Sequence, residues 1–144
     1  MPPTDHGHDA ASDLLMLAAR SMRRAYADAM AGYDVTPSQA RALRTVADLG
    51  PVRLSVLAER LRIAPRSATE VVDDLEARGL VARGPDPDDR RATKVALTAA
   101  GEGLRDRLEG ARRAASDQRL AALSAAERDQ LAALLARLVE RPAD

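Results

Sequence analysis

The sequence contains almost no aromatic residues, and this limits the cores that it can build. Tyr26 and Tyr33 are the only aromatic residues among 144, with no Phe and no Trp. A core must therefore be assembled from Leu, Val and Ala side chains. A chain this short with few large side chains has difficulty burying enough apolar surface alone. We expect one domain, or one domain with an oligomerisation element, that is stable as an oligomer.

The composition excludes several classes of site. Cysteine is absent, which rules out disulfides, thiol redox sensing and thiolate metal ligands. The only histidines, His6 and His8, lie in a polar N-terminal segment, so neither a multi-histidine metal site nor a histidine-based triad is available. No apolar run approaches 18 residues and no signal-peptide pattern opens the chain. We expect a cytoplasmic protein with no metal, no cofactor and no membrane partner.

Charge and short motifs give no sign of an enzyme. The formal net charge is zero, so no overall basic field indicates a nucleic-acid partner. No phosphate-binding loop, nucleophile elbow or apolar cleft with two acids can be recognised. A small hydrolase or isomerase that uses carboxylates therefore has no support in the sequence.

Apolar periodicity and capping signals predict a mainly helical chain. Thr36-Pro37-Ser38-Gln39 has the pattern of a capping box with proline in the first turn, and Ser124 with Glu127 forms a second box. Residues 1–11 are expected to be a disordered arm. The predicted helices cover residues 12–31, 37–48, 56–61 (capped by Ser55), 65–78, a segment capped by Thr98, and a segment from residue 125 that Pro142 ends.

Between the fourth and fifth predicted helices, the pattern changes to that of a hairpin. Residues 80–83 and 93–97 are expected to be two short strands. Residues 84–92 are rich in Pro, Gly and Asp, and we expect a projecting loop that is too long for a tight hairpin. Three short helices followed by such a hairpin are typical of a winged helix-turn-helix, whose second motif helix enters the DNA major groove.

In this arrangement, helix 65–78 is the recognition helix and segment 84–92 is the wing. The first turns of the helix are expected to present Arg66, Ser67 and Thr69 outward. Arginine can donate two hydrogen bonds to guanine, and hydroxyl groups contact base edges or phosphates. An arginine at the tip of the wing can enter the minor groove, where the potential is most negative.

Several segments together resemble the MarR (multiple antibiotic resistance regulator) family. The resemblance covers roughly residues 12–140, and the segments are specific in their order and spacing rather than singly. They are Thr36-Pro-Ser-Gln-Ala-Arg-Ala-Leu43, Leu57-Ala-Glu-Arg-Leu61, Leu75-Glu-Ala-Arg-Gly-Leu-Val81, Asp86-Pro-Asp-Asp-Arg-Arg91 and Val95-Ala-Leu-Thr-Ala-Ala-Gly101. The resemblance implies a homodimeric DNA-binding transcriptional regulator, most often a repressor, that binds a pseudo-palindromic operator.

The resemblance also assigns roles to individual residues. Arg91 corresponds to the wing arginine that enters the minor groove, with Arg90 beside it, and Asp89 corresponds to the acidic residue that pairs with and orients that arginine. Glu70 departs from the pattern, because many members carry a basic residue there. It can accept a hydrogen bond from cytosine, and we expect it to influence specificity.

The later turns of helix 65–78 are acidic, and acidic groups facing phosphates weaken binding. The affinity would then depend on Arg66, Arg62, Arg53 and the wing. A winged-helix module that binds a basic protein instead of specific DNA is the alternative that this acidic helix leaves open.

The chain is expected to divide into the arm (1–11), a dimerisation helix (12–34), a winged helix-turn-helix lobe (35–99) and C-terminal dimerisation helices (100–144). Leu and Ala stripes on the terminal helices have no sheet to cover, and pairing of two copies would bury them. Many relatives hold a small aromatic ligand between the lobe and the dimerisation helices. Tyr26, Met30 and Tyr33 are the candidates for such a pocket here, although packing roles for both tyrosines are the stronger alternative.

Overall fold

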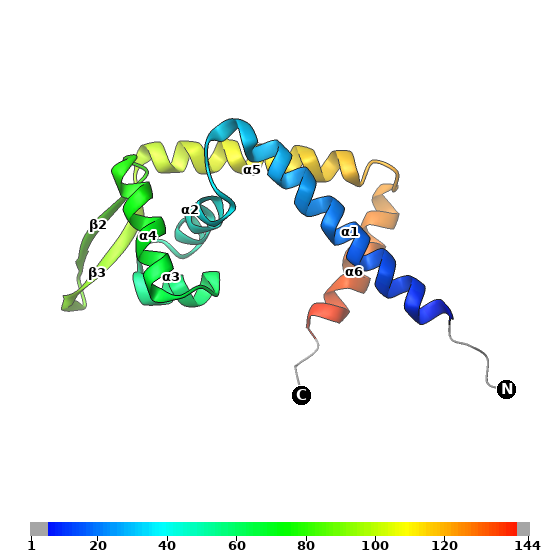
Figure 1. Cartoon of the computed structure of the whole chain (residues 1–144), viewed down its shortest axis with the longest axis horizontal. Coiled ribbons are helices and arrows are strands. Elements are labelled where there is room, and N and C mark those ends of the chain that lie inside the picture. Colours follow the sequence, from blue (N-terminus) through cyan, green and yellow to red (C-terminus); the bar gives the residue numbers. More distant parts are fainter. Residues whose placement is uncertain (1–5, 141–144) are drawn as a thin grey trace. The chain divides into compact units, whose positions relative to one another are not determined.

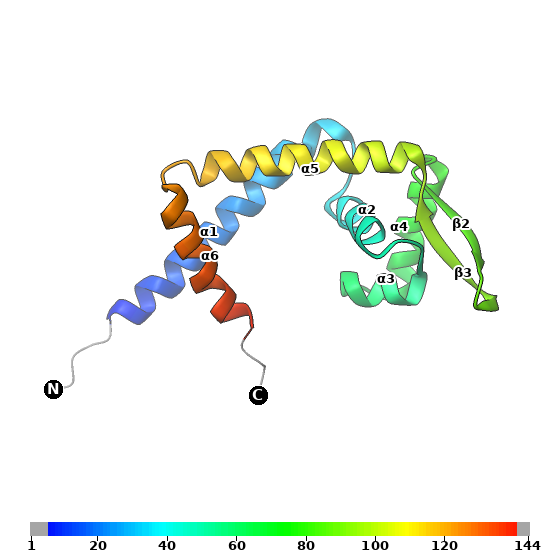
Figure 2. The same ribbon diagram turned by 180° about the vertical axis from the view of Figure 1, so that it is seen from behind.

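The computed structural model describes residues 6–140, with side chains from residue 10 onward. Figures 1 and 2 show the chain from opposite sides. The described residues form two compact units, one made of residues 6–26 with 113–140 and the other of residues 27–112. The elements are α1 (His6–Met30), a 3-10 turn η1 (Ala31–Tyr33), α2 (Pro37–Leu49), β1 (Val52–Arg53), α3 (Leu54–Leu61), α4 (Pro65–Ala77), β2 (Val81–Asp86), β3 (Asp89–Leu97), α5 (Ala99–Arg119) and α6 (Ala125–Val139).

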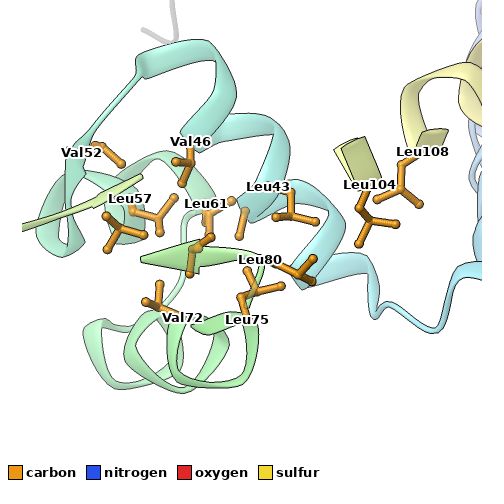
Figure 3. Close-up of a cluster of buried hydrophobic side chains, with 13 residues drawn as sticks. Leu43, Val46, Val52, Leu57, Leu61, Val72, Leu75, Leu80, Leu104 and Leu108 are labelled. Atoms are coloured by element: carbon orange, nitrogen blue, oxygen red, sulfur yellow. The ribbon is translucent and has the colours of Figure 1, made fainter. Parts of the chain in front are cut away.

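The unit of residues 27–112 has an entirely aliphatic buried core, as the composition predicts. Leucines from α2, α3 and α4 meet valines from the sheet, and the N-terminal half of α5 adds Leu104 and Leu108 (Figure 3). The largest side chains that are almost completely enclosed are Leu43, Leu57, Leu75, Val46, Val72, Val81 and Val95. Burying one such side chain contributes about 1.5–3 kcal/mol, so this core fixes α2, α3 and α4 relative to the sheet.

The capping motifs in the sequence correctly predict where α2 and α6 begin. The Thr36 hydroxyl accepts the Gln39 amide, and the Gln39 side chain accepts the Thr36 amide, which starts α2. Ser124 and Glu127 make the same exchange at α6.

Ser55 does not have the capping role predicted for it, because α3 starts at Leu54 with Arg53 as its cap residue. At the other end of the chain, Pro142 lies outside the described residues.

The sheet is larger than predicted. Its three antiparallel strands run in the order β1-β3-β2, and the two-residue strand β1 was not predicted. The prediction of a long loop over 84–92 is wrong. β2 and β3 continue to a two-residue turn at Pro87-Asp88, because Asp86 pairs with Asp89. Figures 1 and 2 show this hairpin projecting beyond the helices of its unit.

Gly101 lets the start of α5 lie against the residue that precedes β2. A Cβ atom at this position would overlap the Leu80 carbonyl oxygen. That same oxygen accepts the Thr98 amide, and the Thr98 hydroxyl accepts the Gly101 amide. Thr98 therefore caps α5 as predicted, and the glycine permits the close approach.

The other unit leaves many apolar side chains exposed. On α1 they are Leu14, Leu15, Met16 and Leu17, and on α6 they are Leu131, Leu134, Leu138 and Val139. No described side chain of α6 is buried.

The start of α1 differs from the prediction. Residues 6–11, expected to be part of a disordered arm, are helical from His6. Ala10 and Ala11 are strong helix formers, which favours a helix that extends beyond residue 12 toward the N-terminus.

Candidate DNA-binding interface

α4 buries one face and exposes the face predicted to read DNA. Ala68, Val72 and Leu75, spaced four and three residues apart, enter the core. Arg66 and Ser67 lie on the exposed side of the first turn, as predicted. Packing of the buried face therefore fixes which side chains α4 presents outward.

Thr69 and Glu70 are also exposed, and each has a partner within α4. The Thr69 hydroxyl donates to the Pro65 carbonyl at 3.1 Å. The Glu70 carboxylate lies 3.5 Å from Arg66 Nε, one helical turn away. The Arg66 side chain is 91% exposed, so this ion pair is weak and leaves the guanidinium accessible.

The acidic turns of α4 are partly neutralised by the sheet. Arg83 of β2 donates to Asp73 Oδ1 at 2.5 Å and also to Glu76. Burial would lower the pKa of Arg83, but these hydrogen bonds raise it above its usual value. Arg83 therefore joins α4 to the wing and offsets two of the charges that were expected to repel phosphate. The role of Arg83 could not be predicted from the sequence, because nothing in the local pattern pairs β2 with α4.

The two wing arginines lie in an irregular part of β3. Pro85 pairs with Thr93, but Asp86 pairs with Asp89, so residues 90–92 have no partner on β2. Such a bulge bends its strand and redirects its side chains. Arg90 and Arg91 are both exposed there, and neither side chain has an ion pair within the described part of the chain.

Asp89 contacts Arg91 through the backbone. Its Oδ1 atom accepts the Arg91 amide at 3.0 Å, and its Oδ2 atom lies 3.9 Å from Arg53 Nη2. The expected pairing of Asp89 with the Arg91 guanidinium is not among the ion pairs of the described residues. Asp89 instead holds the main chain of the bulge from which Arg91 extends, and its orienting role stays a prediction.

Asp86 is the main organising residue of the wing. Its side chain is only 1% exposed and lies 2.5 Å from Arg53 Nη2 and 3.5 Å from Lys94 Nζ. It also accepts the Asp88 amide at 3.0 Å. The Asp88 amide, followed by Arg53 and Lys94, lowers the pKa of Asp86, while burial opposes this.

Arg53 is therefore bound to the wing rather than free. Its pKa is raised by its hydrogen bond to Asp86. Arg53 is expected from the sequence to contribute to DNA affinity, whereas the sequence indicates no role for Asp86. Asp residues in a turn-rich segment normally indicate a solvated loop, so the sequence carried no signal that this one is buried.

The three candidate ligand contacts lie in different surroundings. Met30 and Tyr33 are partly buried and pack against the aliphatic core of residues 27–112. The Tyr26 hydroxyl shares a 2.8 Å hydrogen bond with the Ser116 hydroxyl within the other unit. These contacts agree with the alternative that both tyrosines have packing roles. The ligand pocket stays a prediction.

Metal sites and membrane spans are both absent from the described residues. These residues contain no cluster of three or more His, Cys, Asp or Glu side chains suited to hold a metal ion. Within the same part of the chain, no helix combines the length and the apolar character needed to cross a membrane.

A helix-turn-helix whose second helix faces outward, followed by an arginine-bearing hairpin, defines the winged helix-turn-helix class of DNA-binding proteins. Comparisons with known proteins give the family. A family model described as "MarR family" matches residues 35–93. The HTH-type transcriptional repressor MdtR of Bacillus subtilis is 30% identical over 113 residues, which cover 78% of this chain and 73% of MdtR.

Further relatives agree. An uncharacterized HTH-type transcriptional regulator of Mycobacterium bovis, Mb0904, is 39% identical over 67% of this chain and 68% of its own length. The crystal structure of RV1404 from Mycobacterium tuberculosis is similar with a TM-score of 0.83 and 27% identity, and it covers all of both chains. The chain belongs to the MarR family and is a DNA-binding transcription regulator, not an enzyme.

Proposed function

We propose that this protein is a sequence-specific transcriptional repressor of its own or a neighbouring gene. The observation that carries the proposal is the outward face of α4, where Arg66, Ser67 and Thr69 are exposed while the opposite face is fixed in the core. This face enters the major groove, and Arg90 and Arg91 of the wing enter the flanking minor groove. The related protein MdtR is a transcriptional repressor, which supports the direction of regulation.

The repressor binds as a homodimer. Exposed leucines on α1 and α6 provide the apolar surface that a second copy would cover. Two copies related by a two-fold axis place two α4 helices in successive major grooves, about 34 Å apart. The operator is then roughly palindromic, and its occupation blocks transcription.

We further propose that a small aromatic ligand releases the protein from DNA. A ligand shifts the protein off DNA only if it binds the non-DNA conformation more tightly. A coupling of about 1–3 kcal/mol would be sufficient.

A fluorescence anisotropy titration tests the DNA-binding function. The duplex upstream of the protein's own gene is compared with a random duplex of equal length at two salt concentrations. We expect tighter binding to the upstream duplex and a steep salt dependence for both. Equal affinity for the two duplexes contradicts sequence-specific recognition. Absence of salt-dependent binding to either favours the protein-interaction alternative.

A further inference from the structure

Arg62 has a backbone conformation that does not suit arginine. It ends α3 with φ 54° and ψ 47°, in the left-handed region. A Cβ atom is unfavourable there, and glycine is the usual residue at this position of a helix end. Within the described chain, Asp34 is the only other non-glycine residue with a positive φ.

The fold itself does not use the Arg62 side chain. The end of α3 is satisfied by backbone groups, since the Arg62 and Ile63 amides donate to Glu59 and Ala58 carbonyls at 3.1 Å. Arg41 Nη2 donates to the Leu61 carbonyl at 2.9 Å. The Arg62 guanidinium is exposed, with no hydrogen bond or ion pair to any described residue. Glycine would thus meet every structural need at this position.

The position of Arg62 places its side chain near the exposed face of α4. Arg62 lines a shallow groove of about 380 Å³ between α3 and α4, and Thr69, from the exposed face of α4, lines the same groove. Glu59 also lines it, without an ion pair to Arg62. A free guanidinium therefore lies beside the helix face that is proposed to read bases.

We propose that Arg62 contacts a DNA phosphate next to the bases that α4 reads, and that the chain keeps an unfavourable backbone conformation for the sake of this contact. The inference rests on the proposed DNA-binding function. Strained residues persist where function requires them. Arginine binds phosphate through two parallel hydrogen bonds, and such contacts fix the register of a protein on DNA without reading sequence.

The test compares Arg62→Gly, Arg62→Ala and Arg62→Lys by thermal unfolding and by anisotropy titration over a series of salt concentrations. Arg62→Gly should raise the Tm while it weakens binding roughly tenfold on every duplex. The slope of log K against log salt should fall by about 0.9 for each phosphate that the variant no longer neutralises. Arg62→Ala should bind as weakly without the rise in Tm. Arg62→Lys should keep the slope.

Asp34→Gly is the matched control. It relieves the same kind of backbone strain and should raise the Tm without weakening DNA binding. An unchanged affinity of Arg62→Gly would overturn the phosphate contact while wild-type binding still supports the proposed function. A lower Tm of Arg62→Gly, or a weakening confined to particular bases, would also overturn it. If the wild type shows no salt-dependent binding, the proposed function itself fails.

Discussion

At the scale of single residues, the surroundings of each arginine decide what it can do. Arg53 and Arg83 are bound by carboxylates of the same unit and hold the wing to the rest of the fold. Arg90 and Arg91 are exposed and unpaired within the described chain. Only the second pair is available to DNA without first breaking an ion pair.

Replacing Arg91 with alanine should weaken binding to most duplexes by a similar factor. The side chain is proposed to enter the minor groove, where it responds to the electrostatic potential rather than to base identity. The salt slope should become shallower by about 1 per protomer, as measured by anisotropy titration. The matched control is Arg107→Ala, which removes an exposed arginine from α5 and should leave the slope unchanged. Equal slopes for wild type and Arg91→Ala would exclude the contact.

Replacing Arg66 with alanine should weaken DNA binding in a sequence-dependent way, unlike the replacement of Arg91. Its guanidinium is accessible, and bidentate contact with guanine contributes roughly 1–3 kcal/mol of discrimination. The weakening should therefore be concentrated at one or two positions of each half-site. Competition with duplexes altered one base pair at a time measures this pattern. A uniform weakening across all duplexes would show that Arg66 contacts phosphate instead.

The set of side chains that α4 exposes could be predicted from the sequence, because the 3.6-residue repeat determines which side of the helix is buried. Arg66, Ser67, Thr69 and Glu70 are exposed for that reason. The pairing of Arg83 with Asp73 and Glu76 could not be predicted in this way. It depends on how β2 packs against α4, which is a tertiary contact that no local pattern records.

At the scale of elements, the wing is held by charge as well as by strand pairing. Asp86 joins β2 to Arg53 of β1 and to Lys94 of β3, so a single buried carboxylate connects all three strands. The same carboxylate fixes the turn through the Asp88 amide. The position of the two wing arginines therefore depends on the ionised form of Asp86.

Asp86→Asn should lower both the Tm and the affinity for DNA, because Arg53 and Lys94 lose the negative charge between them. The pKa of Asp86 is lowered in the folded protein. Its stabilising contribution is thus complete above the pKa of an unfolded Asp, about 3.9, and is lost as the pH falls through the lower folded value. Thermal unfolding between neutral pH and about pH 3 should show a weaker pH dependence for Asp86→Asn than for wild type. Identical profiles would contradict the role assigned to Asp86.

Helix boundaries were predicted well where a capping side chain marks them, as at Thr36 and Ser124. The hairpin was predicted poorly because Pro, Gly and Asp are typical of loops. In this protein the Asp86 carboxylate accepts a hydrogen bond from the Asp88 amide in the turn, and the strands continue through residues that have low strand propensity. The two-residue strand β1 is too short for periodicity to reveal it.

At the scale of the whole molecule, the exposed apolar side chains of α1 and α6 bear on the proposed self-association. Leu134 and Leu138 of α6 are 51% and 62% exposed, and Leu14 of α1 is 65% exposed. Contiguous apolar patches are uncommon on monomeric proteins. The expectation from the aromatic-poor sequence, that one copy cannot bury its apolar faces, agrees with this surface.

Replacing Leu134 and Leu138 together with aspartate should convert the proposed dimer to a monomer. Four charges at a two-fold interface would be buried without partners. Sedimentation velocity measures the change in mass, and the affinity for a two-site duplex should fall because each copy then binds a half-site alone. Leu49→Asp, at a 38% exposed leucine of α2, is the control and should remain dimeric. A double variant that still sediments as a dimer would place the interface elsewhere.

The bulge in β3 has a consequence for how the wing can evolve. β2 and β3 pair regularly from the pair of Val81 with Leu97 to the pair of Pro85 with Thr93. Three unpaired residues of β3, 90–92, separate this ladder from the closing pair of Asp86 with Asp89. A shift of one residue in an ordinary hairpin would turn the buried side chains outward. Here an insertion or deletion among residues 90–92 changes only the unpaired segment, and Val81 and Val95 keep their places in the core. The direction in which Arg90 and Arg91 point can thus change while the domain that carries the hairpin stays folded.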